Sequence, residues 1–339
     1  MIKKTIKSAK ETKPVETTSS YKYVKVPMAA VIFTTILLAS LSFYSGLSYA
    51  KSKFIPTIST LDSKVIFAPP KLDKAELKFF VMSFCPYGNQ IEDTLRPVFD
   101  LLGNKANITP HYIFEKIDNL DSYCANRAGV VTQCATYVQN KYFTTETECK
   151  KTVSDNVAKC MDKNAYIVAP SGAMYSSLHG RQEATQNIRE MCVWKMTGDN
   201  KKQWWDFVGA INKGCTAQNA DSCWEDKAKQ VGLDTAAITD CFNKEGMNLI
   251  ETELALTKQF NVSSSPTVLI NDQAFPPEAA YTQDGKGNMK IGKKVATQDR
   301  YRTPNVLKEG ICVGAKSIPK ECNTILPDLS GSAPAAGGC

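Results

Sequence analysis

The chain has 339 residues, 43% of them hydrophobic, and this length allows two average domains or one enlarged domain behind a leader. Its net charge of +7 arises within residues 1–53, which contain nine lysines and only two acidic residues, Glu11 and Glu16. The rest of the chain carries no net charge, which argues against nucleic-acid binding.

A long uncharged segment, residues 26–50, follows the lysine-rich residues 1–25. As a helix it spans about 37 Å, enough to cross a bilayer. Because most flanking lysines precede it, the positive-inside rule places residues 1–25 in the cytoplasm and the rest of the chain outside. We therefore predict a membrane anchor. The alternative is a signal peptide cleaved after Ser48-Tyr49-Ala50, which would give a secreted protein.

The chain contains twelve cysteines, a number that outside the cytoplasm is normally disulfide-bonded. No Cys-x-x-Cys pair occurs, and there are only two histidines, so no zinc site is expected and no cofactor is predicted.

Eight of the cysteines lie in a stretch of mostly helical pattern, about residues 120–259. Antiparallel helices would bring them together as nested pairs, although eight cysteines allow 105 pairings and the symmetry could be accidental. The nested scheme pairs Cys124 with Cys160, Cys134 with Cys149, Cys192 with Cys241 and Cys215 with Cys223, and leaves Cys312 and Cys322 as nearest partners.

An apolar, aromatic-rich run ends abruptly at Cys85. The run predicts a buried strand over residues 76–84, and Pro86 suits the first turn of a helix over residues 88–103. Cys85 should therefore lie at a helix N-terminus, where unpaired amides and the helix dipole favour the reactive thiolate. The alternative is a buried cysteine that acts as a small hydrophobic residue.

This order of strand, cysteine, proline and helix resembles the active-site elbow of thioredoxin-fold proteins, in the glutaredoxin-like form Cys85-Pro86-Tyr87. A second strand at His111–Phe114 would complete the β-α-β opening of that fold. Such proteins usually carry a resolving cysteine three residues after the first, where this chain has Gly88.

A loop and a strand are predicted around Ser265-Pro266-Thr267-Val268, which resembles the cis-proline segment that faces the cysteine in the same fold. The resemblance implies that the backbone of Ser265 pairs with an extended substrate peptide. The alternative is a trans-proline at a strand start. We predict a substrate groove formed by Pro86, Tyr87, Ser265, Pro266 and Thr267. Further on, Met289–Gly292 is expected to form a hairpin strand, and residues 304–310 a helix.

A third stretch, His179–Cys192, resembles the signature of the gamma-interferon-inducible lysosomal thiol reductase family. The residues that match in identity and spacing are His179, Gly180, Glu183, Asn187 and Cys192. Two further signature cysteines are Ser177 and Ala184 in this chain. We interpret the matching residues as structural, with His179 bracing its helix rather than acting as a base. Glu183 and Asn187 are expected to bond to each other.

Together these patterns predict a thioredoxin-like α/β domain over residues 76–325, with a disulfide-braced helical insertion over about residues 120–259. Residues 51–75 are expected to be a linker, and residues 326–339 a flexible tail. The predicted function is an extracytoplasmic thiol–disulfide oxidoreductase in which Cys85 attacks a protein or peptide disulfide. The alternative is a redox-inactive peptide-binding or chaperone-like module, which the glycine at position 88 favours.

The proposed pairing leaves Cys85 and Cys339 without partners. The tail that carries Cys339 would have a root-mean-square reach of about 20 Å, comparable with the radius of the domain. Cys339 could therefore resolve the mixed disulfide of Cys85, within the chain or in a neighbouring chain. Alternatively, a small thiol or a redox partner protein resolves it, and Cys339 is unpartnered, lipidated or joins two chains.

Overall fold

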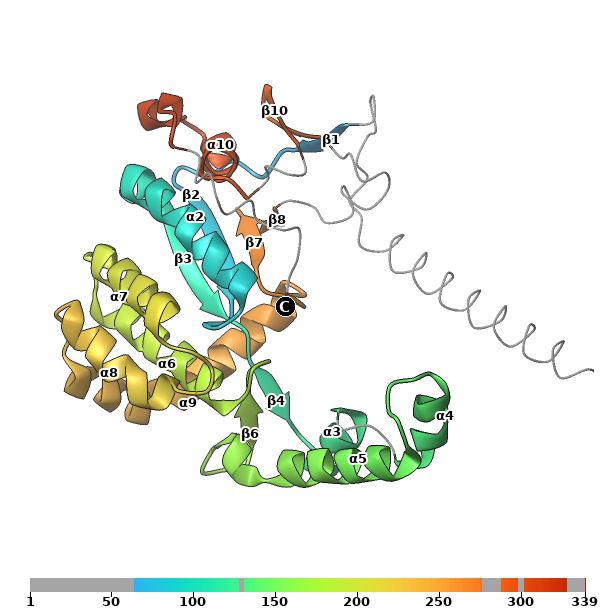
Figure 1. Cartoon of the computed structure of the whole chain (residues 1–339). Coiled ribbons are helices and arrows are strands. Elements are labelled where there is room, and N and C mark those ends of the chain that lie inside the picture. The colour runs from blue at the N-terminus through green and yellow to red at the C-terminus, as the bar shows by residue number, and fades with distance from the viewer. Residues whose placement is uncertain (1–63, 128–130, 276–287, 298–301, 328–338) are drawn as a thin grey trace, which may run out of the picture. The chain divides into compact units, whose positions relative to one another are not determined.

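The computed structural model describes residues 64–127, 131–275, 288–297, 302–327 and 339 (Figure 1). The chain divides into two units, Met1–Ser59 and Thr60–Cys339, and the described residues all belong to the second. The predicted basic tail and membrane span, residues 1–50, lie outside them. Among the described residues, no helix is both long enough and apolar enough to cross a membrane.

The central sheet is built on strand β2, Ala75–Val81, whose aromatic residues are buried on both faces. It pairs in parallel with β3, Ala106–Tyr112, and antiparallel with β7, Thr267–Ile270, which continues into β8, Gln273–Ala274. The order is therefore β3-β2-β7-β8. Phe79 packs against the tryptophans of an inserted helix, whereas Phe80 stacks on His111 at 4.9 Å between ring centroids.

Two helices pack on this sheet and on each other: α2, Pro86–Leu102, and α10, Pro304–Gly314. Each begins with a proline in its first turn, where the missing N–H costs nothing. A parallel β-α-β unit followed by an antiparallel hairpin and a helix is the thioredoxin-like arrangement that the sequence predicts. The helix starts two residues earlier than expected, and the second strand, expected at His111–Phe114, begins already at Ala106.

The insertion between the two halves of the sheet consists of a hairpin-like group of three helices and a bundle of four (Figure 1). The first group is α3 Leu120–Arg127, α4 Cys134–Gln139 and α5 Glu146–Met161; the second is α6 Arg181–Met196, α7 Lys201–Gly214, α8 Ala220–Gln230 and α9 Thr235–Gln259. Short 3-10 turns lie at Val131–Gln133, Lys163–Ala165 and Lys320–Asn323.

A small sheet lies between the two helical groups. The sequence patterns did not indicate this sheet. It has the order β4-β6-β5, with β4 at Glu115–Ile117, β6 at Met174–Ser176 and β5 at Ile167–Val168. Strands of two or three residues are too short to give a periodic signal.

A third sheet joins distant parts of the chain. Strand β1, Lys64–Phe67, pairs in parallel with β9, Asn288–Ile291, which forms the predicted hairpin with β10, Lys294–Thr297. Because β1 lies in the stretch expected to be a linker, folded structure begins upstream of residue 76. Phe67 is 1% exposed and contacts Phe275, so this strand is part of the core.

All twelve cysteines form disulfides, and the four nested pairs and the pair of nearest partners are confirmed. They are Cys124–Cys160, Cys134–Cys149, Cys192–Cys241, Cys215–Cys223 and Cys312–Cys322. The sixth joins the two cysteines that the scheme left over, Cys85 and Cys339.

Candidate active site

Cys85 lies at the junction between β2 and α2. The strand ends at Val81, and a tight turn follows in which the Cys85 amide donates to the carbonyl of Met82 at 3.0 Å. Cys85 is the N-cap of α2, no side chain caps the helix there, and its first turn has no acidic residue. The amides and positive dipole end of α2 therefore face Cys85, and no acidic residue of that turn competes for them.

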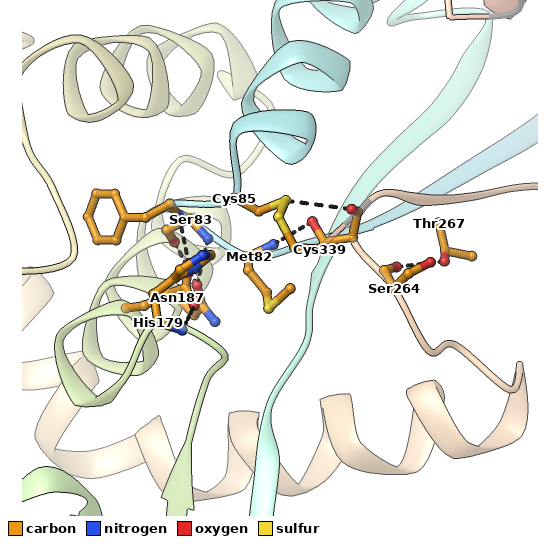
Figure 2. Close-up of a disulfide and its surroundings, with 11 residues drawn as sticks. Met82, Ser83, Cys85, His179, Asn187, Ser264, Thr267 and Cys339 are labelled. Atoms are coloured by element: carbon orange, nitrogen blue, oxygen red, sulfur yellow. Dashed lines mark hydrogen bonds and ion pairs between the residues drawn. A yellow bond between two sulfur atoms is a disulfide. The ribbon is translucent and has the colours of Figure 1, made fainter. Parts of the chain in front are cut away.

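The segment that carries Pro266 lies directly against this cysteine. The Ser265–Pro266 bond is cis, as the sequence predicts, and the Cys85 Sγ lies 3.5 Å from the carbonyl oxygen of Ser265. The hydroxyl of Ser265 accepts a hydrogen bond from the Met82 amide at 3.2 Å, which ties the loop to the end of β2. The Thr267 hydroxyl donates to Ser264, within its own loop (Figure 2).

Cys339 contacts both sides of this junction (Figure 2). Its sulfur is bonded to Cys85, with the two Cα atoms 6.1 Å apart. Its amide donates to the Ser265 carbonyl at 2.8 Å, and its carbonyl accepts from the Ser265 amide at 3.2 Å. This reciprocal exchange is that of a hydrogen-bonded residue pair in an antiparallel ladder. Cys339 therefore pairs with Ser265 as a residue of an added antiparallel strand does.

Gly88 packs so closely that position 88 has no free space for a side chain. A Cβ there would lie 2.9 Å from the Ser265 hydroxyl and 3.3 Å from the Met82 carbonyl oxygen. The neighbouring atoms therefore leave room only for a glycine at position 88, where thioredoxin-fold proteins usually have the resolving cysteine.

Helix α6 supports the elbow through side chains of the signature stretch. The Asn187 side-chain oxygen accepts from the amide of Ser83 at 3.0 Å and from its hydroxyl at 2.7 Å. Glu183 accepts from the amide of Phe84 at 3.0 Å. The expectation that Glu183 and Asn187 bond to each other is wrong, because both side chains are directed at the two residues before Cys85.

His179 and Gly180 shape the start of α6. The His179 Nδ1 lies 2.8 Å from Glu183, and its amide donates to the same carboxylate at 2.9 Å. His179 therefore contacts the residue that holds Phe84, which agrees with a bracing role. Gly180 has φ of 100°, a left-handed conformation that favours glycine. Cys192, further along the helix, is bonded to Cys241.

Two buried carboxyl groups lie beneath the elbow and were not predicted. Glu190 accepts hydrogen bonds from the Tyr112 hydroxyl at 2.8 Å and from Gln186 at 3.0 Å, and burial raises its pKa to about 7. Burial also raises the pKa of Glu92 well above its ordinary value, with the nearby Glu190 charge adding to the effect. Asn212 donates to Glu92 at 2.7 Å. A signal for Glu190 existed in the sequence, because it follows Glu183 and Asn187 at helical spacing.

No metal site accompanies these groups in the described part of the chain. It contains no cluster of three or more His, Cys, Asp or Glu side chains that could hold an ion. The junction contains the Cys85–Cys339 disulfide, the kind of bond on which thiol–disulfide exchange acts.

The family model of the vacuolar sorting receptor thioredoxin-like domain matches residues 100–280, more than half of the chain. The chain belongs to this family. The matched region of this vacuolar sorting receptor-type domain includes Pro266 and α6 but begins after Cys85, so membership does not bear on the elbow cysteine.

Two curated relatives illustrate the match. Vacuolar-sorting receptor 4 of Arabidopsis thaliana is 24% identical over 148 residues, 39% of this chain and 22% of the relative. Vacuolar-sorting receptor 1 of Pisum sativum is 22% identical over 187 residues, 51% of this chain and 25% of the relative. The chain thus spans about a quarter of the length of these relatives. The more specific likeness to the lysosomal thiol reductase family remains a prediction.

Two solved structures resemble this chain distantly. One is a thioredoxin-like oxidoreductase from Silicibacter pomeroyi, with 12% identity, a TM-score of 0.32, and coverage of 60% of this chain and 78% of that one. The other is the thiol-disulfide exchange protein alpha-DsbA2 from Wolbachia pipientis, with 12% identity, a TM-score of 0.32, and coverage of 61% and 76%.

Proposed function

We propose that this chain is an extracytoplasmic thiol–disulfide oxidoreductase that acts on protein disulfides through Cys85. The observation that carries the proposal is that the cysteine at the N-terminus of α2 is bonded to Cys339 while the backbone of Ser265 pairs with the same residue. A helix N-terminus favours the thiolate, and a paired backbone beside it can hold the peptide that bears the reacting sulfur.

In the reductive direction, the Cys85 thiolate attacks one sulfur of the substrate disulfide. The S–S bond breaks, the second substrate sulfur leaves as a thiolate and takes a proton from water, and a mixed disulfide with Cys85 remains. The Cys339 thiolate then attacks the Cys85 sulfur, which releases the substrate sulfur that was bonded to Cys85 and forms Cys85–Cys339. The substrate gains two electrons, and an external thiol or a dithiol redox partner protein must reduce the chain again.

The substrate groove is proposed to follow the backbone of Ser265. An extended peptide would place its cysteine where Cys339 now lies and exchange the same two hydrogen bonds. Pro86, Tyr87 and Thr267 are the proposed flanks of this groove, with buried Pro266 at its base. No side-chain recognition is needed for this pairing, so we expect broad substrate choice.

Iodoacetamide alkylation of a Cys339→Ser variant tests the proposal. In this variant Cys85 is the one cysteine without a disulfide partner, so no reduction is required. We expect Cys85 at pH 6 to react about tenfold faster than free cysteine, because the helix N-terminus stabilises the thiolate. The matched Cys85→Ser variant reports the reactivity of Cys339 alone. If Cys85 in the folded variant does not react with iodoacetamide at neutral pH, the proposed oxidoreductase function is wrong.

That outcome would favour the second candidate, a redox-inactive peptide-binding module. The close packing around Gly88, which excludes the usual resolving cysteine, favours this candidate, as do the relatives, which are named as receptors. Such a module would use the Ser265 pairing without turnover.

The resolving role of Cys339 needs its own measurement. A substrate trapped on Cys85 should be released from the wild-type chain faster than from the Cys339→Ser variant. Equal release rates would show that a small thiol resolves Cys85 and that Cys339 is not required.

The proposed location is outside the cytoplasm, with residues 26–50 as a membrane anchor or, alternatively, as part of a cleaved leader. The complete pairing of the cysteines and the receptor names of the relatives support this location. Protease protection of residues 64–327 in sealed membranes, lost on detergent addition, would test this location.

The likeness of His179–Cys192 to the lysosomal thiol reductase signature supports the proposed thiol–disulfide chemistry.

A further inference from the structure

We propose that the oxidised chain accepts the thiol that reduces it at Cys339 and not at Cys85. The reducing thiolate attacks the sulfur of Cys339, and Cys85 is the leaving thiolate. The first mixed disulfide is therefore carried by Cys339. This inference deepens the proposed function and rests on redox exchange at the Cys85–Cys339 bond.

Access to the two sulfurs is unequal. Cys85 is 0% exposed, whereas Cys339 is partly exposed. Thiol–disulfide exchange is an in-line displacement, so the attacking thiolate must approach the attacked sulfur from the side opposite its partner. The residues around the Cys85 sulfur are buried as well, with Ser83 1% and Ser265 0% exposed. Cys339 is therefore the more accessible residue of the pair.

The leaving groups are unequal in the same direction. Exchange is faster when the departing thiolate is the more stable one. Cys85 departs as the N-cap of the 17-residue helix α2, which has no acidic residue in its first turn. Displacement in the opposite sense would expel Cys339, which belongs to no helix. Access and leaving-group stability therefore select the same sulfur.

The location of Cys339 accounts for this order. Because Ser265 and Met82 fill the space beside Gly88, a partner thiol cannot reach Cys85 from within α2. The partner cysteine, Cys339, instead reaches Cys85 from the side of Ser265, where two backbone hydrogen bonds with Ser265 hold it in place. Because Cys339 lies at the proposed substrate position, an incoming thiol contacts Cys339 before it contacts Cys85.

The reaction balances for the dithiol redox partner that must reduce the chain again. The first partner thiolate bonds to the Cys339 sulfur, and Cys85 leaves with the electron pair of the broken bond. The second partner thiol, deprotonated by water, attacks the first partner sulfur, and Cys339 leaves as a thiolate. The partner loses two electrons and becomes a disulfide, and the chain gains them as two cysteine thiols.

The test locates the first adduct. Oxidised wild-type chain is mixed with N-acetylcysteine at pH 7, quenched at short times with acid, alkylated with N-ethylmaleimide under acidic conditions and digested for mass spectrometry. The amounts of the two adducts are extrapolated to zero time. We expect at least tenfold more N-acetylcysteine on Cys339 than on Cys85, and N-ethylmaleimide on the Cys85 that is released. The Cys215–Cys223 bond in the same sample reports unspecific reduction.

The single variants Cys85→Ser and Cys339→Ser, each bonded to N-acetylcysteine, supply the reference masses for the two adducts. A first adduct on Cys85 overturns the inference, but it leaves the proposed function standing if Cys85 is reactive in the Cys339→Ser variant. Absence of any adduct overturns the inference as well, and together with an inert Cys85 it also refutes the oxidoreductase.

Discussion

The hydroxyl oxygen of Ser265 occupies the space into which a side chain at position 88 would point, 2.9 Å from the site of a Cβ. The same hydroxyl accepts the Met82 amide, so it cannot move away without leaving that buried amide unpaired. The loop of Pro266 and the first turn of α2 are thereby fitted to each other across a glycine.

Gly88→Ala should destabilise the fold although alanine is the better helix former. We expect a loss of about 1–3 kcal/mol in the free energy of unfolding, measured by urea denaturation, because the new methyl group overpacks a filled site. Gly209→Ala is the matched control, since a Cβ on Gly209 in α7 meets nothing within 4 Å. It should stabilise the chain by roughly 0.5–1 kcal/mol. Equal effects of the two changes would contradict the packing argument.

Asn187→Ala should weaken both the fold and the elbow. Removal of the side chain leaves the buried amide and hydroxyl of Ser83 without their acceptor, which should cost about 2–3 kcal/mol. In a Cys339→Ser background, the alkylation rate of Cys85 should also change, because Ser83 fixes the turn before it. The exposed Asn156→Ala should change neither quantity measurably, and a similar loss in both variants would argue against a specific role of Asn187.

The unfolding free energy should decrease as pH rises from about 4.5 towards 7. Glu190, with its pKa raised to about 7, retains its proton in the folded chain over this range, whereas in the unfolded chain it loses it near its ordinary value. The stabilisation is therefore complete at low pH and is lost with rising pH, by roughly 1–3 kcal/mol. Chemical denaturation at pH 5 and pH 7.5 measures it. Glu190→Gln should flatten the dependence and the exposed Glu225→Gln should not; a dependence unchanged in Glu190→Gln would assign it to other groups.

His179→Ala distinguishes a bracing histidine from a catalytic base. Loss of the contact with Glu183 should lower the unfolding free energy by about 1 kcal/mol. The pH profile of Cys85 alkylation, measured in the Cys339→Ser background, should keep its shape. An inflection of this profile that disappears in His179→Ala would instead show that the imidazole takes part in activating the thiol.

The elements of the fold could be predicted where the signal is local. Pro86 at the first turn of α2 and the strand before Cys85 follow from residue type. The spacing of the cysteines suggested the four nested disulfides and Cys312–Cys322, although it left other pairings open. The cis-proline followed from resemblance rather than from local physics. The small β4-β6-β5 sheet and the strand at Lys64–Phe67 were missed, since very short strands form only because of tertiary pairing.

The two cysteines of the site could be predicted from the sequence, but most of the hydrogen bonds that hold them in place could not. Cys85 and Cys339 were identified as the remaining cysteines, but the pairing of Cys339 with Ser265 involves backbone groups, which leave no mark in a sequence. Glu183 and Asn187 were recognised by their pattern, yet their partners Ser83 and Phe84 lie about a hundred positions away and depend on how α6 docks.

The Cys85–Cys339 bond has a sequence separation of 254, and the other five disulfides lie between its ends. The bond makes most of the described chain a covalent ring. In the chain-entropy account, closing a loop of this length disfavours the unfolded state by about 5 kcal/mol. The reduction that frees Cys85 also opens the ring and removes this contribution. The reduced chain should therefore unfold at lower temperature and swell more on unfolding, so each catalytic cycle would pass through a less heat-resistant form of the molecule.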